Sequence, residues 1–193
     1  MLWWAEPASA QGAGLGAQAW RETPVRWLMT PGEARQVSRL RDDLELAQFM
    51  DAFWKRRDPD PSQAGNEFQL EFRQRVELAD LLYGSDAARG SLSPRGGAFI
   101  LLGPPSHLSQ GFQTIPRLGV SRRATGPQAR GTLQVETWSW RPEDLSPRLR
   151  ALLERKGWSI PLSMTFHLRP SQVSLAEGDD LMELAARSYL QQE

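Results

Sequence analysis

The chain has 193 residues, of which 40% are hydrophobic and 24% are charged, and its formal net charge at pH 7 is zero. This size and composition are typical of a globular domain that buries a core without help from a metal or a disulfide. The balanced charge gives no overall field to attract nucleic acid or an anionic membrane, the absence of cysteine excludes disulfides and thiol catalysis, and no apolar run reaches the ~18–20 residues of a membrane helix.

The first 23 residues differ in composition from the rest of the chain. Residues 1–5 are apolar, and residues 8–10 (Ala-Ser-Ala) resemble the end of a secretory signal peptide that is cleaved after Ala10. A disordered tail is the other interpretation, and residues 11–23, rich in Gly, Ala and Gln, are typical of a linker. We therefore expect residues 1–20 to pack little and residues 24–193 to form one domain. A periplasmic or secreted location is favoured over a cytoplasmic one.

The first half of the domain is predicted to be mainly helical. Residues 24–29 alternate in polarity, which predicts a short strand. Three helices then follow, and each begins at a capping pair: Thr30 with Glu33, Asp42 with Glu45, and Asn66 with Gln69. The second helix is expected to end at the proline-rich segment 58–61 and the third at Gly84.

The second half is predicted to be mainly strands. The apolar run 98–102 lies between glycines and predicts a buried central strand, whereas residues 106–131 show no period and predict a long loop, functional or disordered. Residues 133–139 alternate without indicating which face is buried. Residues 158–168 alternate with their apolar side chains at even positions, as in a sheet with one wet face.

Two further helices complete the predicted order, one opened by Ser146 and one capped by Asp179 or Asp180. Because the helices come first and the strands later, we expect an α+β fold. In it the N-terminal helices pack on a mostly antiparallel sheet formed by the C-terminal half.

Three segments in this order resemble the GWxTD domain family, a bacterial group. They are residues 53–59 (FWKRRDP), 95–105 (RGGAFILLGPP) and 136–140 (ETWSW), and the resemblance covers roughly residues 25–175. The motif that names the family is degenerate, because residues 90–94 (GSLSP) keep only its glycine. The resemblance implies a fold and often an exported context, and it implies no reaction.

One set of polar residues is a candidate binding cluster where the helices meet the first central strand. Its arginines could clamp a carboxylate or a phosphate. The structural interpretation, which we favour, is a lock at a helix end where Asp58 accepts hydrogen bonds from backbone or arginine donors. The members are Arg57, Asp58, Glu67, Arg73 and Arg95.

A second candidate surface combines the long loop with aromatic side chains. The arginines could meet an anionic partner or be solvated, and the tryptophans could stack on a sugar or peptide or belong to the core. The histidines, His167 included, have no metal-ligand spacing and are expected to be exposed or structural. The candidate residues are His107, Arg117, Arg122, Arg123, Trp138 and Trp140.

These features favour a non-catalytic interaction module of the bacterial cell envelope that binds an unknown protein or polymer. No cofactor, metal or specific nucleic acid is expected. The alternative is a hydrolase that uses the carboxylates of Asp58 and Glu67 with arginine support. The hydrolase requires these two carboxylates to line an open cleft, whereas the interaction module does not.

Overall fold

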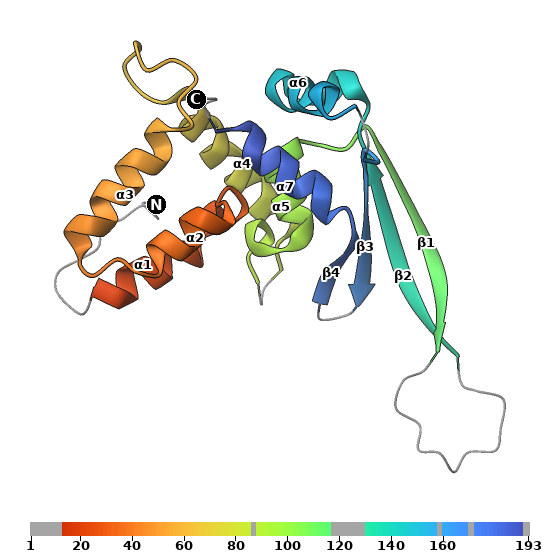
Figure 1. The fold of residues 1–193 in the computed structure, drawn as a ribbon. Helices are drawn as coiled ribbons and strands as arrows, with labels where there is room; N and C mark the ends of the chain where they lie inside the picture. Colours follow the sequence, from red (N-terminus) through yellow and green to blue (C-terminus); the bar gives the residue numbers. More distant parts are fainter. Residues whose placement is uncertain (1–12, 86–87, 117–129, 158–159, 170–171, 191–193) are drawn as a thin grey trace.

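The computed structural model describes residues 13–85, 88–116, 130–157, 160–169 and 172–190. Figure 1 shows the helices gathered on one side of a four-stranded sheet, with the β1–β2 hairpin extending away from them. The elements are α1 (Ala13–Arg21), η1 (Pro24–Trp27), α2 (Pro31–Val37), α3 (Asp43–Lys55), α4 (Glu67–Tyr83), η2 (Gly90–Leu92), α5 (Pro94–Leu102), β1 (His107–Pro116), β2 (Arg130–Ser139), η3 (Pro142–Asp144), α6 (Pro147–Arg155), β3 (Ser163–Arg169), β4 (Gln172–Glu177) and α7 (Asp179–Ser188). The sheet is antiparallel throughout and comes from the C-terminal half, which confirms the predicted α+β class.

The start of the described chain is a helix, so the linker predicted for residues 11–23 is wrong from residue 13 onward. Ala17 and Trp20 of α1 are buried, and the Trp20 ring packs edge-on against Phe49 and Phe53 of α3 at 5.7 and 5.1 Å. A large aromatic side chain gains enough from burial to order a segment of low-complexity composition. Residues 1–12 lie outside the described residues.

The segment predicted as a strand at residues 24–29 is a short 3₁₀ helix instead. Pro24 occupies its first position, where the missing N–H costs nothing and the fixed φ suits a helical turn. Val25 and Leu28 are both buried, which is the spacing of one helical face rather than of a strand.

The three predicted capping pairs are all present. Thr30 and Glu33 form a complete capping box at α2. The side chains of Asp42 and Asn66 accept from the third residue of α3 and α4, at 2.8 Å from Glu45 N and 2.9 Å from Gln69 N. As predicted, α4 ends at Gly84.

The apolar run 98–102 belongs to α5, so the prediction of a buried strand is wrong. Ser93 caps the helix through a hydrogen bond from Gly96 N at 3.1 Å, Pro94 begins it, and Gly103 ends it at φ +79°. A Cβ on Gly97 would come within 2.6 Å of the Trp27 ring, so this close approach requires glycine. Because α5 is buried all round, its composition has no helical period and matches a buried strand equally well.

The sheet has the order β1-β2-β3-β4. Residues 107–116 form β1, which corrects the prediction of a loop over 106–131, and residues 117–129 lie outside the described residues. The β1–β2 ladder runs without interruption from His107↔Ser139 to Pro116↔Arg130, so the predicted strand at 133–139 is confirmed. No sequence signal had indicated β4.

The alternation at residues 158–168 is confirmed where the structure describes it. Met164 and Phe166 of β3 are fully buried and Leu168 is partly buried, as are Ile160 and Leu162 just before the strand. The strand begins only at Ser163, and residues 158–159 lie outside the described residues.

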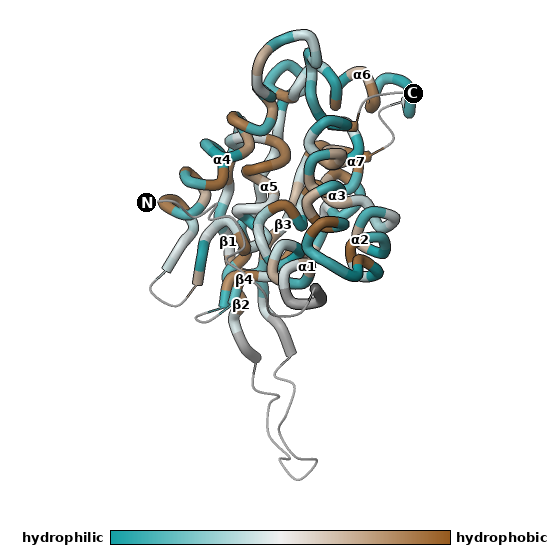
Figure 2. The backbone as a smooth tube through the Cα atoms, turned by 90° about the vertical axis from the view of Figure 1, so that its left-hand side faces the viewer, coloured by the Kyte–Doolittle hydropathy of each residue, from teal (hydrophilic) through white to brown (hydrophobic). Residues whose placement is uncertain are grey.

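Helices α5 and α7 cover the inner face of the sheet at β4 and β3. Figure 2 shows hydrophobic colouring in the middle of the molecule around α5. Helix α7 begins at Asp179, with Gly178 rather than an aspartate as its N-cap. Its end is fixed to α5 by Tyr189, whose hydroxyl donates to Leu101 O at 2.6 Å. Within the described residues, no helix is both long and apolar enough to span a membrane.

Candidate functional site

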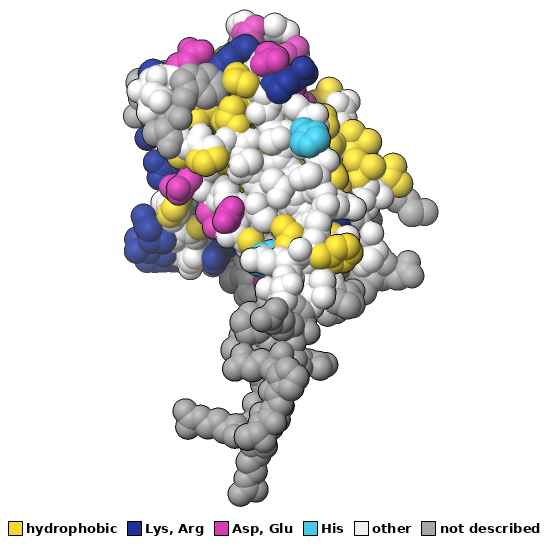
Figure 3. Space-filling model, turned by 90° about the vertical axis from the view of Figure 1, so that its right-hand side faces the viewer, with side chains coloured by type: hydrophobic (Ala, Val, Ile, Leu, Met, Phe, Trp, Pro, Cys, Tyr) yellow, Lys and Arg dark blue, Asp and Glu magenta, His cyan; other side chains and the backbone are white. Residues whose placement is uncertain are grey.

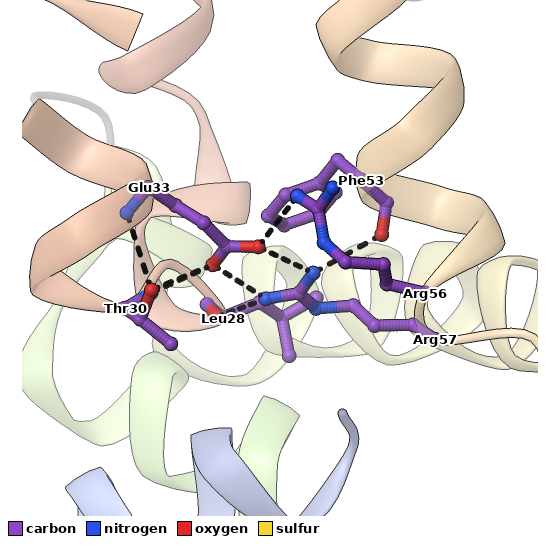
Figure 4. Close-up of polar contacts among 6 residues, drawn as sticks. All are labelled: Leu28, Thr30, Glu33, Phe53, Arg56 and Arg57. Carbon is purple, nitrogen blue, oxygen red and sulfur yellow. Dashed lines mark hydrogen bonds and ion pairs between the residues drawn. The ribbon is translucent and has the colours of Figure 1, made fainter. Parts of the chain in front are cut away.

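Arg57, the first residue of the predicted polar cluster, is completely buried and pairs with Glu33 rather than with Asp58. Its Nη1 and Nη2 atoms donate to Glu33 Oε1 and Oε2 at 2.9 and 2.8 Å, a bidentate arrangement (Figure 4). The same two nitrogens donate to Phe53 O at 3.0 Å and Leu28 O at 2.8 Å. The guanidinium also lies 3.7 Å from the centroid of the Phe53 ring.

Glu33 receives more than the Arg57 fork. Arg56 Nη2 donates to Glu33 Oε1 at 2.9 Å, and the Thr30 backbone N–H donates to Oε2 at 2.9 Å. Burial by itself raises the pKa of Glu33, but the hydrogen bonds and charge of Arg57, with those of Thr30 and Arg56, outweigh it and lower the pKa to about 2. Glu33 is therefore ionised at neutral pH and its oxygens are fully used.

This arrangement joins three elements: α2 through Glu33, α3 through Arg57, and the end of η1 through Leu28. Arg57 has no exposed surface, its unpaired Nε is buried, and both carboxylate oxygens of Glu33 are occupied, so neither residue presents a group to a ligand at the surface. It has the features of a structural lock.

The other members of the predicted cluster do not join this pair. Asp58 accepts a hydrogen bond from the Asp60 backbone N–H at 3.1 Å, as expected at a helix end. Glu67 is exposed in the first turn of α4, and Arg73 is half-buried further along the same helix. Arg95 contacts a different carboxylate, on β2.

That carboxylate is Glu136, which is almost completely buried. It accepts from Trp138 Nε1 at 2.7 Å and Gln110 Nε2 at 2.8 Å, and Arg95 Nη1 lies 3.6 Å from its Oε1. Arg95 also lies over the Tyr83 ring, 5.5 Å from its centroid. This group joins α4, α5, β1 and β2. Glu136 was not among the residues predicted from the sequence, although a charged residue on the same strand face as two tryptophans is a signal for it.

The structure settles which face of β2 is buried. Glu136, Trp138 and Trp140 lie on the buried face, and Trp138 and Trp140 are 0% and 4% exposed. Trp138 contacts Trp140, Phe166 and the Tyr83 ring. The core interpretation of these tryptophans is therefore correct, and they offer no flat surface to a sugar.

The histidines lie on the opposite, outer face of the sheet. The register places His107 beside Ser139, and His167 beside Val135. Among the residues that the structure describes, no three His, Asp or Glu side chains are grouped so that they could hold a metal ion. Arg117, Arg122 and Arg123 lie outside the described residues, so their part in the predicted basic loop stays a prediction.

Among the described residues, β1 of the β1–β2 hairpin has exposed side chains from His107 to Thr114. The outer face of the hairpin continues onto β3 and includes the charged Arg169 and the buried Leu133. The other outer residues are His107, Ser109, Gly111, Gln113, Val135, Thr137, Ser139, Ser163, Thr165 and His167. Figure 3 shows that uncharged groups predominate on this side and that charged side chains lie toward its rim. On the inner face, Leu108 and Phe112 of β1 are 46% and 78% exposed, because the helices stop short of this edge.

The described residues form a hollow on the hairpin and another between the N-terminal helices. One, of about 310 Å³, lies over Gly111 on the hairpin, where Ser109, Gln113, Val135 and Thr137 are part of its lining. The other, of about 610 Å³, lies between α1, η1 and α2, with Arg21 and Arg26 beside an apolar lining that includes Met29 and Val37. Neither Asp58 nor Glu67 lines these two hollows.

Comparisons with protein-family models, with curated proteins and with solved structures found no match to this chain.

Proposed function

We propose that the protein is a non-catalytic binding module whose partner is another protein, bound along the β1–β2 hairpin. One observation carries this proposal: β1 is ten residues long without a charged side chain, and its side chains are exposed from His107 to Thr114. Edge strands usually carry charges, bulges or a covering segment, because an unprotected edge pairs with other chains. A long, uncharged, exposed edge is suited to receiving an added strand.

A protein partner is favoured over a polymer such as a polysaccharide. The tryptophans that the sequence offered for stacking on a sugar, Trp138 and Trp140, are buried in the core. An edge strand instead offers backbone N–H and C=O groups, which bind an extended polypeptide by the same ladder that holds a sheet together.

The alternative of a hydrolase has no supporting geometry. Its two carboxylates differ in surroundings, since Asp58 holds the turn at the end of α3 and Glu67 is exposed on α4. A carboxylate pair needs a common substrate site between its members, and neither residue lines the hollow on the hairpin or the one between α1, η1 and α2.

The proposed setting is the cell envelope, supported by the signal-like pattern of residues 1–10 and by the resemblance to the GWxTD family. Fractionation of cells that make the full-length protein tests the setting. Recovery in the periplasmic or secreted fraction is expected, and recovery only in the cytoplasm would reject it.

The binding surface can be tested by placing a photo-crosslinking amino acid at Gln113, which is exposed on β1. The matched control is the same substitution at Gln36, which is also exposed but lies on α2, away from the hairpin. We expect a discrete protein adduct from position 113 in intact cells and none from position 36. Equal adducts at both positions, or none at 113, would refute the hairpin as the binding surface.

A further inference from the structure

The two edges of the sheet differ in how well they are protected. Edge strand β4 has six residues, ends at Glu177, and joins β3 with a register shift at Thr165/Phe166. Edge strand β1 has ten residues, no charge, and an uninterrupted register with β2. Charges, irregular register and shortness are the features that prevent edge-to-edge pairing, so β4 is protected and β1 is open.

We propose that the partner of this edge is a second copy of the same chain, and that two β1 strands pair antiparallel about a two-fold axis to form one eight-stranded sheet. The inference rests on the proposed function, since it names the protein that the hairpin binds. An isologous pair of this kind needs a surface that is complementary to itself. An uncharged strand meets this condition without bringing like charges together.

Leu108 and Phe112, the exposed apolar residues of β1, determine the register that we expect between the two β1 strands. Opposed residues in an antiparallel pair share a face. If the two-fold axis passes beside Gln110, each Gln110 lies opposite the Gln110 of the other copy. Leu108 of each copy then lies opposite Phe112 of the other copy. Leu108 and Phe112 are 46% and 78% exposed in the single chain. Each would be covered by the other residue type from the second copy, in two equivalent pairs. On the outer face, Ser109 would lie opposite Gly111, which has open space above it.

The shape of the molecule leaves room for this pairing. The described helices lie on the far side of the sheet from the open edge of β1, and the hairpin extends beyond β3 and β4 (Figure 1). With the two strands antiparallel, the helical bodies of the two copies lie toward opposite ends of the joined hairpins. The described outer residues of the two hairpins then form one continuous surface without a charged side chain.

The absence of cysteine allows a direct test by single-cysteine crosslinking of the full chain. Gln110→Cys places the two sulfurs opposite each other at the axis, and oxidation should give a covalent dimer. Thr114→Cys is the control, since Thr114 would lie opposite Ser106 and the two copies of residue 114 would be about 27 Å apart, well beyond disulfide reach. A dimer from position 114 but not from 110 would overturn the register.

Gln110 also donates a hydrogen bond to Glu136, so Gln110→Cys could disturb the fold. A second pair of variants avoids this contact. Mixing Ser109→Cys protein with Gly111→Cys protein should give crosslinked heterodimers, and neither position contacts Glu136 in the ladder. Failure of both Gln110→Cys and this mixture to crosslink overturns the proposed pairing.

Sedimentation of the purified protein supplies an independent measurement. Phe112→Asp should raise the dimer dissociation constant about tenfold or more, since two cross-strand apolar pairs are lost. Leu81→Asp, at a comparably exposed leucine of α4, should leave the constant unchanged. A purely monomeric parent refutes self-pairing, yet an adduct from Gln113 with a different protein in cells would still support the hairpin as a binding surface. Absence of both would refute the two proposals together.

Discussion

Removing Glu33 should destabilise the protein far more than removing an exposed carboxylate. In Glu33→Ala the guanidinium of Arg57, which has no exposed surface, keeps only the carbonyls of Phe53 and Leu28 as partners. Breaking a buried ion pair in this way costs about 3–5 kcal/mol, because a charge is left in the interior without its counter-charge. Chemical denaturation of the parent and the variant measures this loss directly.

The dependence on pH gives the same interaction a second signature. The pKa of Glu33 falls from 4.5 to about 2 on folding, which corresponds to about 3 kcal/mol of stability at neutral pH. For a lowered pKa, this contribution is complete above the unfolded value and is lost as pH falls from about 4.5 toward 2. Glu33→Gln keeps the shape and lacks this titration, so it should be less stable at pH 7 and lose less stability on acidification.

The control is Asp51→Ala, which removes the exposed partner of Lys55 at 2.8 Å. Such surface pairs contribute little, so its unfolding free energy should stay close to that of the parent. Two results would refute the reasoning: a Glu33→Ala variant as stable as the parent, or parallel acid unfolding of the parent and Glu33→Gln.

Substitutions at three other positions test the packing and the helix signals, each by its denaturation midpoint. Phe166→Ala empties a fully buried position and should cost about 3–5 kcal/mol, so an unchanged midpoint would contradict the assigned core. Gly90→Ala should be strongly destabilising, because the added Cβ would come within 2.1 Å of Ala79 O. A variant as stable as the parent would show that the close approach of residue 90 to α4 does not require glycine. Ser93→Ala should cost about 1 kcal/mol through the lost cap of α5, whereas Ser93→Thr, which keeps the hydroxyl, should restore most of it.

The last of these substitutions bears on the degenerate family motif. Where the motif has threonine, this chain has Ser93, whose hydroxyl caps α5, and a threonine hydroxyl can cap in the same way. Gly90, the one motif residue that is kept, is required by the close approach of η2 to α4. Membership of the GWxTD family remains a proposal that these two positions support.

Local chemistry made the helix starts predictable. The caps at Thr30, Asp42 and Asn66 depend on a side chain three residues away from the N–H that it satisfies, so a short stretch of sequence contains the whole interaction. The alternation through Met164 and Phe166 was equally informative, since one face of β3 is buried and its period is visible in the sequence.

Tertiary packing decided the rest. The run 98–102 became a helix because α5 is enclosed on all sides, and an apolar run without a period does not distinguish a buried helix from a buried strand. Strand β1 was missed for the opposite reason, since most of its length is exposed on both faces and leaves no alternation to detect. Arg57 was recognised as important, but its partner Glu33 is 24 residues away. Only the folded chain brings Glu33 of α2 beside the end of α3, and long-range pairing of this kind depends on that geometry rather than on any local pattern.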